Sequence, residues 1–156
     1  ALSLTSPVSK QDGIDHEAFG IDSPQQIGNS WDINPDPIVA TFRRLKIGVH
    51  REDVQGQATL DGIVTVGDRE CLDVSAKVYI KKIDPPLPAG FKTKRFFGSI
   101  RMTGKFPLDL SLGVLEESLD LAVEFVGESR PNANGPVITV TDASTVTRKS
   151  QTTYPK

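Results

Sequence analysis

The chain has 156 residues, of which 37% are hydrophobic and 24% are charged, and its formal net charge is −2. This length suits a single domain with a core of its own. No stretch of the sequence approaches the ~18 consecutive apolar residues of a membrane-spanning helix. Cys71 is the single cysteine, which excludes a disulfide within the chain. We therefore expect no membrane partner and a reducing rather than a secretory environment.

The charged residues are unevenly distributed along the chain. Residues 1–42 contain one lysine and six acids, and residues 43–105 contain 13 basic and seven acidic residues. Residues 106–156 contain four basic and seven acidic residues. An acidic beginning and a basic middle of this kind either compensate each other within one chain or attract each other between copies of the chain.

Residues 1–37 are predicted to form an extended N-terminal arm. Four prolines and three glycines interrupt this stretch, and its apolar residues follow no sustained period. Both properties are typical of loops and extended segments. The large aromatic side chains of the arm, Phe19 and Trp31, need a surface on which to be buried. We expect these two residues to anchor the arm on a neighbouring subunit.

Alternating apolar and polar residues indicate β-strands in the rest of the chain. The clearest case is residues 70–82, in which Leu72, Val74, Ala76, Val78 and Ile80 share one parity. This pattern is typical of a strand that covers a core with one face and meets water with the other. Similar alternation predicts further strands at residues 38–49 (with a bulge near 43–44), 58–66, 96–102, 108–114, 119–125 and 137–146.

Two interpretations of residues 106–127 remain open. The alternation favours a hairpin that turns at residues 116–118, whereas the spacing of Leu112, Leu115 and Leu119 also fits a helix. With the hairpin, the chain has about seven strands with short connections, which predicts an all-β fold. We expect an antiparallel, jelly-roll-like β-sandwich or barrel over residues 38–149, followed by a polar C-terminal tail at residues 150–156.

Catalytic and metal-binding patterns are absent from the sequence. His16 and His50 are isolated from each other, and the segment from Asp32 to Asp36 begins like a calcium-binding loop. Pro37 then occupies the position at which such a loop needs glycine. Acidic neighbours of Cys71 disfavour a reactive thiolate. We therefore predict a protein that is not an enzyme, with no cofactor and no bound metal.

Basic residues of the middle third are candidates for contacts with nucleic acid or with another subunit. Phenylalanines interleave with them between residues 91 and 97, and basic groups with aromatics bind single-stranded nucleic acid through phosphate contacts and base stacking. The candidate contact residues are Arg43, Arg44, Lys81, Lys82, Lys94 and Arg95.

Two functions agree with this organisation. The one we expect is a structural subunit of a large homo-oligomeric assembly, of the general type of small viral coat, decoration or tail proteins. Its partners would be copies of itself and other particle proteins, and it would reside in a virion or in host cytoplasm. The alternative is a β-sandwich module that binds a ligand or single-stranded nucleic acid through the basic face of residues 77–105.

Overall fold

The computed structural model describes residues 19–20, 25–87, 89–109, 112–130, 132 and 134–154. The helices are α1 (Asp36–Arg44) and a short 3-10 helix, η2 (Arg51–Asp53). Most of the predicted arm, residues 1–18 and 21–24, lies outside the described residues, as do the last two residues of the tail. The strands are β1 (Ser30–Asp32), β2 (Val54–Val66), β3 (Arg69–Ile80), β4 (Phe91–Pro107), β5 (Glu116–Ser129) and β6 (Ile138–Gln151).

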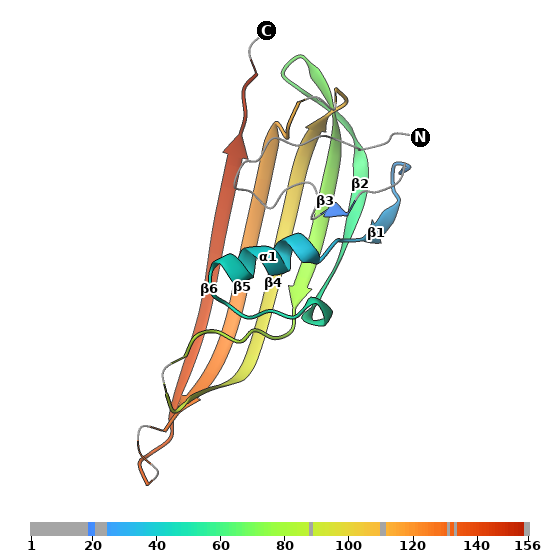
Figure 1. Cartoon of the computed structure of the whole chain (residues 1–156). Helices are drawn as coiled ribbons and strands as arrows, with labels where there is room; N and C mark the ends of the chain where they lie inside the picture. The colour runs from blue at the N-terminus through green and yellow to red at the C-terminus, as the bar shows by residue number, and fades with distance from the viewer. Residues whose placement is uncertain are drawn as a thin grey trace.

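These six strands form one antiparallel sheet in the order β1-β2-β3-β4-β5-β6. Figure 1 shows the long strands side by side, with the short β1 at one edge and β6 at the other. The β2–β3 turn contains Gly67, whose φ of 64° is a conformation that glycine adopts without steric cost. The all-β class is confirmed. The described residues form an open meander, however, and not the two packed sheets or the closed barrel that we expected.

β3 confirms the predicted strand and its two faces. Lys77 and Tyr79 are exposed on one side, and the register of β3 with β4 places Ile100 and Met102 on the opposite, buried side. The apolar side therefore spans several strands and forms the core. The buried side chains of β3 that point into this core are Leu72, Val74, Ala76, Val78 and Ile80.

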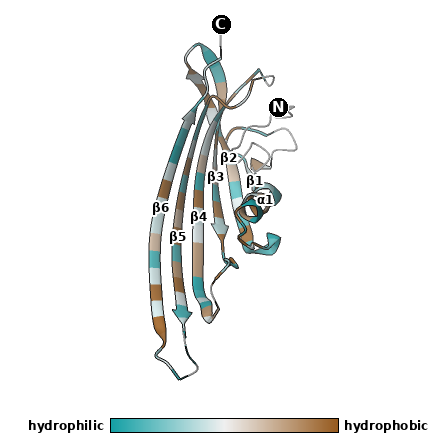
Figure 2. Cartoon of the chain, turned by 60° about the vertical axis from the view of Figure 1, so that its left-hand side comes forward, coloured by the Kyte–Doolittle hydropathy of each residue, from teal (hydrophilic) through white to brown (hydrophobic). Residues whose placement is uncertain are grey.

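α1 covers the apolar face of the sheet, and its presence corrects the bulged strand predicted for residues 38–49. Pro37 lies in the first turn of the helix, where no backbone N–H is needed. Asp36 in the first turn and Arg43 and Arg44 in the last turn complement the helix dipole. Ile38 is fully buried in the core cluster, and Figure 2 shows α1 against one face of the sheet. We call this the covered face, and the opposite one the open face.

Phe19 and Trp31 contribute to the core of their own chain. The Phe19 side chain is 1% exposed and packs edge-on against Phe106, with the ring centroids 5.5 Å apart. Trp31 packs against the same core, and its Nε1–H donates a hydrogen bond of 2.6 Å to the Phe19 carbonyl oxygen. Neither aromatic residue therefore needs a neighbouring subunit for its burial. β1 and the start of α1 also place residues 30–37 within the folded domain.

One of the two strands of the hairpin predicted for residues 106–127 is present, and the other is not. Residues 119–125 lie in a strand, but that strand begins at Glu116, so residues 116–118 do not form a turn. The described residues between β4 and β5 contain neither a strand nor a helix. The Leu115 N–H instead donates to the Lys105 carbonyl, and its own carbonyl accepts from Thr152. Two of the predicted strands are therefore replaced, one by α1 and one by this loop, and the short β1 is added. The described sheet has six strands and not about seven.

Candidate functional site

β6 is a long edge strand, and no residue that the structure describes pairs with its outer side. All 14 of its residues are exposed, and it pairs only with β5. Ile138, Val140 and Val146 extend the apolar covered face beyond β5. The other edge of the sheet is β1, which has only three residues. Natural proteins usually shorten, twist or charge an edge, because its free N–H and C=O groups template pairing with another chain. β6 therefore has the character of a contact surface.

The open face of β3 and β4 carries an aromatic pair beside two cations. Tyr79 and Phe97 are 44% and 43% exposed, and their ring centroids lie 6.0 Å apart. Lys77 lies two residues from Tyr79 on the same face, and the strand register places it directly opposite Arg101 of β4. No ion pair joins either cation to a described residue. The two positive charges are therefore available to a ligand.

A groove with a volume of about 1080 Å³ adjoins this group of residues. Polar side chains of β2, β3 and β4 line it on the open face, and they offer both donors and acceptors of hydrogen bonds. The groove thus combines an aromatic ring and amide groups with charges of both signs, because Asp32 and Glu52 also line it. The lining side chains that matter for recognition are Gln55, Gln57, Ser75, Lys77, Tyr79 and Arg101.

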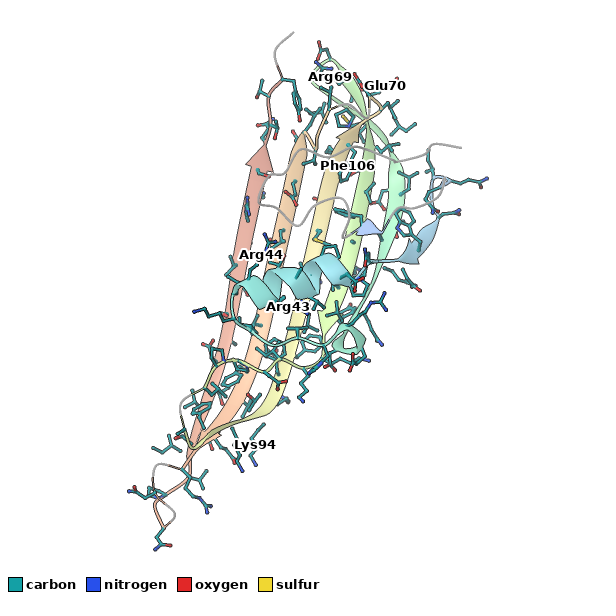
Figure 3. All side chains as sticks on the ribbon, in the orientation of Figure 1. Arg43, Arg44, Arg69, Glu70, Lys94 and Phe106 are labelled. Carbon is teal, nitrogen blue, oxygen red and sulfur yellow. The ribbon has the colours of Figure 1, made fainter. Side chains whose placement is uncertain are left out.

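The six basic residues predicted as contacts are not gathered into one site. Arg43 and Arg44 end α1, and Figure 3 shows them far along the sheet from Lys94, which lies beside a bulge in β4. Lys81 follows the end of β3. Three of the six have acidic partners: Lys82 with Asp84 at 3.8 Å, Lys94 with Glu128 at 3.0 Å and Arg95 with Glu124 at 3.7 Å.

The basic face predicted for residues 77–105 includes Lys77, Tyr79, Phe97 and Arg101, but none of these four was among the individual contact residues selected from the sequence. The alternation shows that Lys77 and Tyr79 share a face, and the same holds for Phe97 and Arg101. Only the pairing of β3 with β4 shows that the two pairs meet. The missing signal was therefore the register between two strands that are joined by a long loop.

Cys71 has the environment of an unreactive thiol. It is fully buried outside the main core cluster, and its Sγ–H points to the Arg69 carbonyl oxygen at 3.8 Å. Burial raises the pKa of the Cys71 thiol, and the nearby Glu116 carboxylate raises it further. The thiol is therefore protonated at neutral pH.

Metal-binding geometry is absent from the part of the chain that the structure describes. There, no group of three or more histidine, cysteine, aspartate and glutamate side chains is placed to hold an ion. His50 lies 3.7 Å from Asp84, and both side chains are exposed. His16 lies outside the described residues.

No family model, no curated protein and no solved structure matches the chain. Within the described ranges, no helix is both long and apolar enough to cross a membrane. The class that the structure defines is an open antiparallel meander with one helix on its covered face. The surfaces of this fold that can contact a partner or a ligand are the β6 edge and the open face.

Proposed function

We propose that the protein is a structural subunit of a homo-oligomeric assembly in which β6 pairs with β6 of a second copy. The observation that carries this proposal is the exposure of all 14 residues of β6 at the edge of the sheet. Addition of a strand to such an edge supplies a ladder of backbone hydrogen bonds. It also removes the exposed apolar side chains Ile138, Val140 and Val146 from water where the second strand covers them.

The sequence of β6 is compatible with itself in one antiparallel register. A two-fold axis relates two identical antiparallel strands, and the midpoint of β6 lies between Ser144 and Thr145. An axis at Thr145 pairs almost the whole strand. It also sets Asp142 of each copy opposite Arg148 of the other, on the covered face. Opposite charges in such positions stabilise a sheet by ~0.2–1 kcal/mol each. Arg148 has an interaction within its own chain as well.

A viral particle of coat, decoration or tail type is the class of assembly that we propose. Growth beyond a dimer needs a second kind of contact. The uneven charge supports one, because residues 1–42 carry six acids and one lysine, while residues 43–105 carry 13 basic and seven acidic residues. Attraction between these regions of neighbouring copies would weaken as salt is added. In this proposal the protein resides in the virion or in the host cytoplasm.

The mass of the full chain in solution tests the assembly. Light scattering at several concentrations should give at least twice the 16.9 kDa of one chain. Val146→Lys places a charge in the β6 contact and should lower the mass to that of the monomer. Val137→Lys is the matched control, because Val137 is also exposed but lies just outside β6. A monomeric unmodified protein at every concentration, or equal effects of the two substitutions, would refute the proposal.

Cysteine cross-linking tests the register. With the axis at Thr145, the two copies of Thr145→Cys face each other at a Cα separation of ~4.5–5.5 Å, within the range of a disulfide. Thr141→Cys lies on the same face but opposite Lys149, and it should not cross-link. The buried Cys71 of the unmodified protein should give no dimer on oxidation. Cross-linking at residue 141 instead would contradict this register, and cross-linking at neither position would contradict β6 pairing.

A further inference from the structure

The aromatic pair on the open face has no structural role in the core. Tyr79 and Phe97 contact each other at 6.0 Å between centroids, with a tilt of 35° between the ring planes. Both rings remain more than two-fifths exposed, and α1 lies on the opposite side of the sheet. Adjacent aromatic side chains on an uncovered sheet surface are the arrangement on which nucleic-acid bases stack.

The neighbouring cations form no ion pair with a described residue. Lys77 and Arg101 are directly opposite each other on adjacent strands, and like charges in such positions destabilise a sheet. Asp120 of β5 lies directly opposite Arg101 on its other side and offsets part of that charge, whereas Lys77 faces the neutral Gln57 of β2. The other acids of the open face include Asp73, which pairs with Lys105 at 2.6 Å, and Glu124, which pairs with Arg95 at 3.7 Å. A bound anion would relieve the repulsion between the two cations.

We propose that the open face of β2, β3 and β4 binds single-stranded nucleic acid. Tyr79 and Phe97 stack against bases, and Lys77 and Arg101 contact the phosphates. Two residues along a strand span ~7 Å, so the cations lie beside the aromatic pair, within reach of the backbone of a stacked nucleotide. Gln55 lines the groove next to these residues and offers an amide to base edges. This site needs only one chain, so it is independent of the assembly through β6.

The chemistry of the face favours a polyanion over a neutral ligand. A carbohydrate would also stack on Tyr79 and bond to amides, but it would leave the repulsion between Lys77 and Arg101 in place. A double helix would keep its bases stacked upon each other and away from the aromatic rings. A flexible single strand satisfies the aromatic and the charged groups together.

Fluorescence anisotropy with a labelled oligouridine tests the proposal. The oligonucleotide has about 12 nucleotides, which lies within the ~4–16 nucleotides that one single-strand-binding domain of the OB-fold type covers. Tyr79→Ala or Phe97→Ala should weaken binding about 5- to 150-fold, and Tyr79→Phe should retain it. The pair Lys77→Gln and Arg101→Gln should reduce the dependence of log affinity on log salt by ~1.4, which corresponds to two phosphate contacts. Circular dichroism verifies that each variant is folded.

Controls separate this site from other basic residues and from the assembly. The pair Arg43→Gln and Arg44→Gln removes two exposed arginines of α1, on the other side of the sheet and outside the groove, and should leave the affinity and most of the salt dependence unchanged. Val146→Lys should still bind the oligouridine even where the assembly is lost. If the unmodified protein does not bind at low salt, or binds neutral oligosaccharides or duplex RNA more tightly, the proposal is overturned. Equal losses from the groove pair and the control pair would also overturn it.

Discussion

Replacement of Ile38 in α1 by alanine measures how strongly the helix holds the sheet. Ile38 is 0% exposed and belongs to the core cluster. Truncation of such a side chain to alanine removes buried methyl groups and leaves a cavity, and it costs ~2–5 kcal/mol. The higher helix propensity of alanine returns less than about 0.7 kcal/mol. For a chain of this size each kcal/mol shifts the melting temperature by ~2–4 °C. We therefore expect Ile38→Ala to lower it by about 4–20 °C.

Ile27→Ala is the matched control, because Ile27 is 59% exposed and its truncation should change stability by no more than about 0.5 kcal/mol. Urea unfolding can be followed by the fluorescence of Trp31, the only tryptophan, which packs against the core. Protein concentration must be held constant, because the proposed assembly would add to the apparent stability. Equal losses in the two variants would refute the packing of α1 on the sheet.

Three further changes probe other parts of the domain. Val78→Asp buries an unpaired charge and should be severely destabilising, whereas Lys77→Asp on the open face should be mild, and equal thermal melts would contradict the assigned faces. The fold raises the pKa of the Cys71 thiol. The unfolded chain therefore loses this proton above the ordinary cysteine pKa of about 8.5, while the folded protein still holds it. The contribution of Cys71 to the free energy of unfolding is thus complete below a pH of about 8.5 and is lost as pH rises through the higher pKa of the folded state. Urea titrations over this range should therefore show a decline that Cys71→Ala lacks, and a decline of the same size in both proteins would disprove the link. Deletion of residues 1–37 removes Phe19, Trp31, all of β1 and the start of α1 and should lower the unfolding free energy, and an unchanged value would contradict the assignment of these residues to the folded domain.

Strands with one buried face were predictable from the sequence, whereas elements without such a face were predicted only in part, as for β6, or not at all, as for β1. β3 shows clear alternation because every second side chain enters the core. β6 is exposed on both faces, so nothing in its sequence indicates that the strand continues from residue 146 to Gln151. β1 has three residues, which is too short to show a period.

The helix was missed because a short window fits two patterns. Ile38 and Phe42 lie four residues apart, which suits one face of a helix, and four is also an even spacing that suits a strand. Pro37 in the first turn and the arginines in the last turn were the usable signals. The open-face site depends on the pairing of Lys77 with Arg101. That register is set across a connection of ten residues between β3 and β4, and no local pattern encodes it.

The strict agreement between strand order and chain order affects how the protein is made. Each strand pairs with the one synthesised just before it, so the sheet can grow by successive hairpins as the chain leaves the ribosome. β6 comes last, and its outer edge exists only once the rest of the sheet is available to orient it.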